Sequence, residues 1–228
     1  MANYRCNCGA DVAHPRIPEC GGDRRRGLDP YAQIQELKEE LTEAQHQIVE
    51  LSRDCVSGLL TRGSFEKHLL GVFEQNRHDD RPFGIIMVDI DHFKAVNDEH
   101  GHRVGDEVIY QVARAIGGCT RTTDIVARYG GEEFVCLLVQ TDLAGLAILS
   151  ERLRQSVEAL AIKGCPRVTI SVGFALQNEG DPSGWQVVER ADAALYRAKD
   201  LGRNRVESET LHQPEITLVE QIDHQRNQ

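Results

Sequence analysis

The heptapeptide Arg-Tyr-Gly-Gly-Glu-Glu-Phe at residues 128–134 constrains the fold of this chain more than any other segment. It lies between two short apolar runs, 124–127 and 134–139, that are typical of strands. Gly130 and Gly131 tolerate the positive φ angles of a tight turn, and without side chains they leave room for a ligand against the backbone. The pattern predicts a β-hairpin with acidic residues at its tip.

The two acidic residues at this tip, Glu132 and Glu133, should have different roles. Alternate residues of a strand point to opposite faces, so only one of the two can share a face with a given neighbour. An isolated Gly-Gly-Glu-Glu is more often a surface turn with solvated acids. A functional interpretation therefore depends on other parts of the chain.

A second acidic segment ends a strand-like apolar run, Ile85–Ile90, with Asp89 and Asp91. Period-two geometry puts both carboxylates on one face, where a close pair is costly unless a cation neutralises it. Magnesium suits such a pair, because it keeps several waters and bridges one or two protein carboxylates to substrate phosphates. The pattern indicates phosphoryl or nucleotidyl transfer; alternatively, Asp91 simply caps the turn that follows.

These motifs resemble the GGDEF family of diguanylate cyclases, in its GGEEF variant, over roughly residues 54–206. The segment 54–62 is similar to the family's opening motif D-x-L-T-G-L-x-N-R, with two mild departures. Residues 88–109 are similar to its metal and guanine segment, and residues 190–206 to its closing helix and strand. Three separated motifs in the right order make the resemblance specific.

The resemblance implies that Asp89, the backbone carbonyl of Ile90 and Glu132 bind two magnesium ions, which manganese could replace. Glu133 then supports the metals or the attacking hydroxyl, and the choice of general base between the two glutamates stays open. The backbone amides around Phe93 and Lys94 would hold the β and γ phosphates. Positive charge would come from the side chains of Lys94, Lys199 and Arg203. This assistance is local, because the whole chain has a formal net charge of -10.

Asn97 and Asp106 match the family's guanine-binding residues, with Gly130 and Gly131 also lining the substrate. Guanine presents two N–H donors together with acceptor atoms, which a carboxylate and an amide can pair. The resemblance therefore implies GTP rather than ATP as substrate. An alternative makes Asn97 a turn residue and Asp106 the N-cap of a helix over 107–116, and both interpretations can hold together.

Arg121 and Asp124 match the family's R-x-x-D inhibitory site, five residues before the glycine pair. An arginine can bind a phosphate or a guanine edge in bidentate fashion, while an aspartate accepts from guanine N–H groups. The resemblance implies feedback inhibition by the product, cyclic di-GMP. Arg152 could supply a second arginine, although an insertion of one residue would select Arg154 instead. The alternative is a solvated loop with Asp124 at a strand start.

Residues 31–56 carry apolar side chains at alternating spacings of three and four. Such a seam predicts a short parallel coiled coil, with Asp29 as N-cap and Pro30 at the first helical position. The alternative is an amphipathic helix folded on its own domain. A homodimer also follows from the implied reaction, because a two-fold symmetric product requires two facing nucleotide sites. A regulatory protein that binds the stalk helix is the simplest source of an input signal.

Composition favours a cytoplasmic enzyme without a membrane span or a nucleic-acid partner. No apolar run approaches the ~18 residues of a membrane helix, and the polar N-terminus lacks a signal-peptide core. Seven cysteines show no disulfide framework, so reduced thiols are expected. Four N-terminal residues could bind zinc, although their spacing is more typical of a flexible tail. They are Cys6, Cys8, His14 and Cys20.

The expected fold is an α+β sandwich with helices around a mainly antiparallel sheet, and the resemblance implies a palm-like nucleotidyl cyclase domain. The expected parts are a flexible segment 1–28, a stalk helix 29–56, the cyclase domain 57–207 and a polar tail 208–228. The expected elements are strands 84–90, 124–129, 133–139, 168–176 and about 204–207, and helices 104–117, 143–161 and 185–200. A rival function is a catalytically silent receptor of cyclic di-GMP that signals through the stalk, although its usual mark, a damaged motif or a lost Asp89, is absent here.

Overall fold

The computed structural model describes Ile34, Lys38 and residues 52–79, 82–165 and 167–209. Ile34 and Lys38 are helical. The predicted zinc ligands, nearly all of the stalk and the C-terminal tail beyond Glu209 lie outside the described residues. The zinc site and the coiled coil therefore stay predictions.

A six-stranded sheet forms the centre of the described domain, in the order β1-β3-β4-β2-β5-β6. The elements along the chain are β1 (Leu60–Thr61), α2 (Arg62–Asp79), β2 (Gly84–Ile90), α3 (Phe93–His100), α4 (His102–Cys119), β3 (Ile125–Arg128), β4 (Glu133–Leu138), α5 (Leu143–Glu158), β5 (Ile170–Leu176), α6 (Gly184–Asp200) and β6 (Val206–Ser208). The pairs β2–β4, β2–β5 and β3–β4 are antiparallel, whereas β1–β3 and β5–β6 are parallel. The central strand β2 is buried along its whole length.

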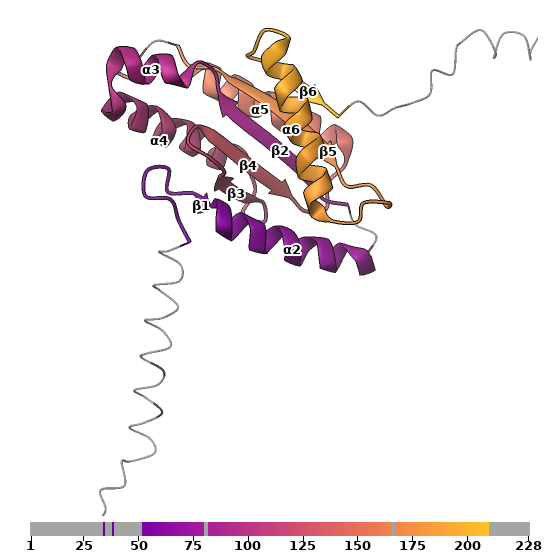
Figure 1. The fold of residues 1–228 in the computed structure, drawn as a ribbon. Helices are drawn as coiled ribbons and strands as arrows, with labels where there is room; N and C mark the ends of the chain where they lie inside the picture. Colours follow the sequence, from indigo (N-terminus) through magenta and orange to yellow (C-terminus); the bar gives the residue numbers. More distant parts are fainter. Residues whose placement is uncertain (1–33, 35–37, 39–51, 80–81, 166, 210–228) are drawn as a thin grey trace, which may run out of the picture. The chain divides into compact units, whose positions relative to one another are not determined.

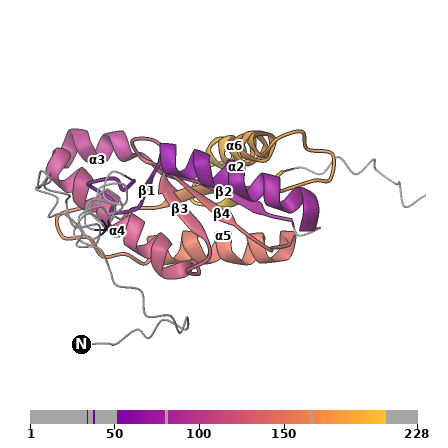
Figure 2. The same ribbon diagram turned by 90° about the horizontal axis from the view of Figure 1, so that it is seen from below.

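Helices cover both faces of this sheet, with α2 and α6 on one face and α4 and α5 on the other (Figures 1 and 2). Alternation along β2 divides the core between them. Ile86, Val88 and Ile90 pack into the core beneath α3, α4 and α5, whereas Ile85 and Met87 pack against α2 and α6. Asp89 and Asp91 continue the second series and therefore face the α6 side. The end of β2 is thus where carboxylates replace core residues.

Each strand and helix predicted within residues 57–207 is present, and strand 84–90 has the predicted bounds. The structure adds α2, α3 and β1, which sequence patterns did not indicate. Gly63 and Gly71 lie inside α2 and lower its intrinsic helix propensity, so the packing of its apolar side against the sheet stabilises it instead. The short helix α3 begins without a side-chain cap.

The prediction that the stalk helix continues to residue 56 is wrong at its C-terminal end. Residues 52–58 form a turn in which the carboxylate of Asp54 accepts the backbone N–H groups of Val56 and Ser57, at 3.2 and 2.8 Å. Arg53 makes an isolated antiparallel bridge with Leu60. An aspartate that binds its own downstream backbone competes with helix formation, and here the turn is favoured.

Candidate active site

The end of β2 and the hairpin tip meet through the backbone. Asp89 pairs with Glu133 across β2 and β4, and the N–H of Ile90 donates to the carbonyl of Glu132 at 3.2 Å. The N–H and C=O of one strand residue face the same neighbouring strand, so the carbonyl of Ile90 also lies on the Glu132 side. The three predicted metal-binding residues are therefore adjacent in the fold.

Charge is concentrated on the α6 side of this junction. The ammonium of Lys199, in the last turn of α6, lies 2.7 Å from a carboxylate oxygen of Asp89, whose side chain is 8% exposed. Burial raises the pKa of Asp89 above its ordinary value even though Lys199 opposes the shift. Burial, followed by the charge of Asp89, likewise raises the pKa of Glu132. Both carboxylates are thus incompletely compensated by the protein.

A divalent cation would supply the missing compensation, so these residues fit magnesium. Two carboxylates and one backbone carbonyl are hard oxygen donors, which is the ligand type that magnesium prefers. In the described part of the chain no three His, Cys, Asp or Glu side chains group closely enough to hold a metal. The second glutamate has a separate position, as sequence alternation predicted. A Cβ atom added at Gly130 would lie 2.4 Å from the Oε2 atom of Glu133, so this carboxylate bends back over the turn.

Arg128, at the end of β3, connects the hairpin tip to the turn before β1, a contact that the sequence pattern does not predict. Arg128 donates from Nε and Nη2 to the carbonyl of Gly131, at 3.2 and 2.6 Å, and from Nη1 to Asp54 at 3.0 and 3.1 Å. The turn that precedes β1 is thereby joined to the acidic tip. Opposite charges in two separate motifs were the available signal, although neither motif shows that they meet.

The predicted guanine-binding residues lie together at the contact between α3 and α4. A Cβ atom added at Gly105 would lie 2.0 Å from the Oδ1 atom of Asn97, so the amide of Asn97 rests directly on the residue before Asp106. Asp106 is exposed. The alternative interpretations of both residues are wrong: Asn97 is inside α3, and α4 begins at His102, four residues before Asp106.

The predicted phosphate-binding groups surround the same edge of the sheet. Phe93 and Lys94 form the start of α3, where no side chain caps the N-terminus, so the first backbone N–H groups can bind an anion. The Phe93 ring is buried and the Lys94 side chain is exposed. Lys199 contacts Asp89, and Arg203 follows in the loop after α6.

The R-x-x-D segment forms a closed turn between α4 and β3. The carboxylate of Asp124 accepts the backbone N–H of Arg121 at 2.8 Å, and the Arg121 side chain is exposed. From α5, the Nη2 atom of Arg152 donates to the carbonyl of Cys119 at 2.5 Å. The alternative, Arg154, instead pairs with Glu151 and Glu158. The geometry therefore brings Arg152, and not Arg154, to this turn.

Asp91 neither caps the following helix nor faces a lysine or arginine within ion-pair distance among the described residues. The N-cap position of α3 is His92, which has a φ of 56° and makes no capping hydrogen bond through its side chain. The Asp91 carboxylate is buried and accepts hydrogen bonds from the hydroxyls of Thr169 and Ser171, both at 2.6 Å. The alternative interpretation of Asp91 as a cap is therefore wrong.

Comparisons with known proteins agree with this arrangement. The family described as "Diguanylate cyclase, GGDEF domain" matches residues 51–205. Diguanylate cyclase DgcM of Escherichia coli K12 is 41% identical over 170 residues, which cover 75% of this chain and 40% of DgcM. The chain thus matches less than half the length of this curated relative.

Two solved structures have the same fold. The coiled coil and GGDEF domain of DgcB from Caulobacter crescentus, in complex with c-di-GMP, is 33% identical with a TM-score of 0.71, covering 80% of this chain and 97% of that one. Diguanylate cyclase SiaD of Pseudomonas aeruginosa, in complex with its activator SiaC, is 34% identical with a TM-score of 0.69, covering 80% and 72%.

Proposed function

The chain belongs to the GGDEF-domain family of diguanylate cyclases, and on this premise we propose that it condenses two molecules of GTP into cyclic di-GMP with release of pyrophosphate. The observation that carries the proposal is the junction of Asp89, Ile90 and Glu132, where two carboxylates of raised pKa meet a backbone carbonyl and Lys199. This is the donor set and charge distribution that a magnesium-dependent nucleotidyl transfer requires.

Two magnesium ions would be held by Asp89, the carbonyl of Ile90 and Glu132; when bound, they would neutralise phosphate charge and lower the pKa of the attacking 3′-hydroxyl. The protein itself would hold the triphosphate at the start of α3, at the backbone of Phe93 and Lys94. Lys199 can turn from Asp89 to the phosphates once that carboxylate has another cation. Either glutamate of the tip could take the hydroxyl proton.

Guanine would bind beside Asn97 and Asp106, where α3 and α4 meet. The carboxylate accepts from the N–H groups of the base, and the amide both donates and accepts, so adenine leaves these groups unpaired. This selectivity is supported by the exposure of Asp106 and by the packing of the Asn97 amide against the preceding residue, Gly105. GTP should therefore be used in preference to ATP.

The reaction requires two copies of the chain, since each copy provides one nucleotide site and the product has two equivalent linkages. The predicted stalk over residues 29–51 is the proposed means of dimerisation and the surface at which a regulatory protein acts. The relatives described with a coiled coil and with an activator support this arrangement. Described residues contain no helix that is both long and apolar enough to cross a bilayer.

Product inhibition is the proposed role of the turn at Arg121 and Asp124. Arg152 lies against the end of α4 next to this turn, so a second guanidinium is available for a phosphate or a guanine edge. The described relative that contains c-di-GMP supports binding of this ligand by the family.

The test is product analysis after incubation of the purified full chain with magnesium and GTP, with ATP and a Glu132→Ala variant in parallel. Cyclic di-GMP from GTP alone, lost in the variant, is the expected result. Absence of product together with cyclic di-GMP binding would identify a silent receptor instead. Absence of both would overturn the proposal.

A further inference from the structure

The loop after α6 has a conformation that its sequence alone does not favour. Gly202, Arg203 and Asn204 have φ angles of 112°, 63° and 45°, so three consecutive residues lie in the left-handed region. Glycine adopts this conformation freely and asparagine tolerates it, whereas arginine does so rarely. Such a run persists only where the surrounding structure holds it. One stabilising contact is local: the N–H of Arg203 donates a hydrogen bond to the carbonyl of Ala198 at 2.9 Å.

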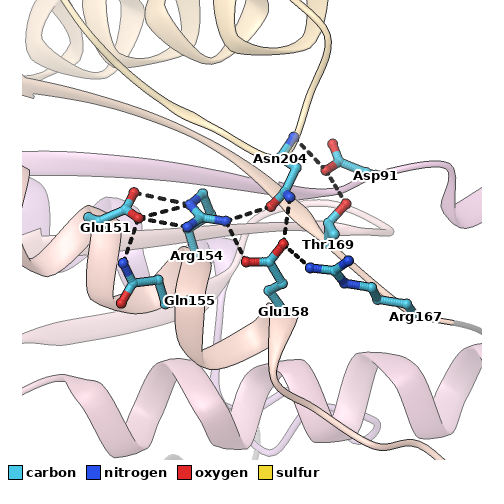
Figure 3. Close-up of polar contacts among 8 residues, drawn as sticks. All are labelled: Asp91, Glu151, Arg154, Gln155, Glu158, Arg167, Thr169 and Asn204. Atoms are coloured by element: carbon cyan, nitrogen blue, oxygen red, sulfur yellow. Dashed lines mark hydrogen bonds and ion pairs between the residues drawn. The ribbon is translucent and has the colours of Figure 1, made fainter.

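A second contact that stabilises this loop conformation comes from the end of β2. The carboxylate of Asp91 accepts the backbone N–H of Asn204 at 3.0 Å, across 113 positions of sequence. The hydroxyls of Thr169 and Ser171 fix this carboxylate from β5 and the segment before it. Figure 3 shows Asp91 between Thr169 and the backbone of Asn204. Asp91 is 5% exposed, so the contact is protected from competing water.

A third set of stabilising contacts joins the side chain of Asn204 to α5. Its Nδ2 atom donates to Glu158 at 2.8 Å, and its Oδ1 atom accepts from Nη1 of Arg154 at 2.9 Å. Arg154 also bonds Glu158 and Glu151, and Arg167 pairs with Glu158, so the asparagine joins a continuous charged cluster (Figure 3). Every polar atom of the Asn204 side chain therefore has a partner on one helix.

The loop Gly202–Asn204 lies beside the candidate active site. Lys199, four residues before Arg203, contacts Asp89 at 2.7 Å. Asn204, the residue after Arg203, is bonded through its backbone N–H to Asp91, two positions after Asp89, so the backbone at Arg203 lies beside the end of β2. The backbone that carries Arg203 is thus fixed by Asp91 and Asn204, and neither of these two residues needs to touch the substrate.

We propose that Asp91 and Asn204 are positioning residues for Arg203: the Asp91 carboxylate and the Arg154–Glu158 pair hold the loop Gly202–Asn204 in its left-handed conformation and so aim the Arg203 guanidinium at the triphosphate of GTP. This inference rests on the proposed function for the identity of the ligand. It assigns to the second aspartate of the β2 end a role different from metal binding, although it lies only two positions from Asp89.

A double-mutant cycle on the full chain tests the assignment. The variants are Asp91→Ala, Arg203→Ala and the two combined, and the readouts are KM for GTP and kcat. Each single change should raise KM about tenfold, as expected for one lost charge-assisted contact. Because both act through one guanidinium, the combined variant should show no more than the larger single effect. A combined effect equal to the product of the two would overturn the proposal.

Conservative variants separate positioning from folding. Asp91→Asn keeps one acceptor oxygen and should recover part of the lost affinity, and Asn204→Gly keeps the backbone angles while losing the side-chain bonds to α5. If Asp91→Ala does not fold, the cycle is run with Asn204→Gly in its place, with the same non-additive result expected. Asp142→Ala is the control, because it removes a comparable carboxylate cap at the distant start of α5. It should lower the melting temperature and leave KM unchanged.

Hydrogen exchange gives a readout that does not depend on catalysis. The amides of Arg203 and Asn204 should exchange faster in Asp91→Ala than in the unsubstituted chain, with α5 unchanged. Equal exchange rates for these amides in the two proteins would refute the conclusion that Asp91 stabilises the loop. If the unsubstituted chain makes no cyclic di-GMP, the proposed function fails by itself, and the exchange result still decides whether Asp91 fixes this loop.

Discussion

Gly105→Ala should remove the predicted guanine recognition without unfolding the domain. Gly105 is buried at the contact between α3 and α4, and an added Cβ atom would meet Oδ1 of Asn97 at 2.0 Å, Cγ at 3.0 Å and the ring of Phe93 at 3.3 Å. Ordinary contact begins near 3.4 Å, so the amide oxygen must move by about 1.4 Å. A displacement of that size takes Asn97 away from any base that it binds.

The expected loss follows from the value of one bidentate base contact, about 1–3 kcal/mol. This corresponds to a decrease of about 5- to 150-fold in kcat/KM for GTP. Stability should change little, because replacing glycine by alanine inside a helix gains up to about 1 kcal/mol, which offsets the cost of moving one short side chain. The substitution therefore separates recognition from folding.

The assay compares kcat/KM for GTP and for inosine triphosphate, which lacks the N2 amino group. The unsubstituted chain should prefer GTP, and Gly105→Ala should reduce this preference. Gly117→Ala is the matched control in the same helix, since nothing lies within 4 Å of its added Cβ atom. It should raise the melting temperature by about 2–4 °C and leave both nucleotides unaffected. Unchanged GTP kinetics in Gly105→Ala would refute the assignment of Asn97.

Three further predictions concern the metal, the inhibitory turn and the hairpin tip. Magnesium should raise the melting temperature of the unsubstituted chain but have a much smaller effect on Glu132→Gln, because a carboxylate ligand is lost; equal magnesium shifts would contradict the assignment of Glu132. Arg152→Ala should weaken inhibition by cyclic di-GMP about tenfold, whereas Arg154→Ala should lower the melting temperature and leave inhibition intact, and the reverse pattern would select Arg154. Asp54 has a pKa below its ordinary value, since hydrogen bonds from Ser57 and Arg128 outweigh the opposing effect of burial. Because the pKa of Asp54 is lower in the folded protein than in the unfolded chain, the ionised carboxylate stabilises the fold at pH values above the unfolded-state pKa. This stabilisation is lost as the pH falls through the folded-state pKa. The melting temperatures of the unsubstituted chain and of Asp54→Asn should therefore differ at pH 6 and draw together as the pH falls below about 4, the ordinary pKa of an aspartate, and a gap that does not change with pH would count against this ion pair.

Local sequence patterns were sufficient for the elements whose apolar periodicity is clear. Strand β2 has the predicted bounds, because a short apolar run, 84–88, leads directly into the first carboxylate, Asp89. The hairpin of β3 and β4 also follows from the sequence, since two glycines between strand-forming runs allow little else. The sequence pattern does not indicate helix α2, because its glycines weaken the helical signal. The pattern also predicts a stalk that is too long, because the turn at Asp54 does not interrupt the spacing of the apolar residues.

The sequence by itself therefore determined the family, the sheet strand with its acidic end and the residue types of the site. Tertiary structure decided which polar groups meet: Asp54 with Arg128, Asp89 with Lys199, and Asp91 with the backbone N–H of Asn204. It also brought Arg152 rather than Arg154 to the inhibitory turn. The physical reason is that periodicity fixes the face on which a side chain lies, whereas its partner depends on how distant helices and loops pack onto that face.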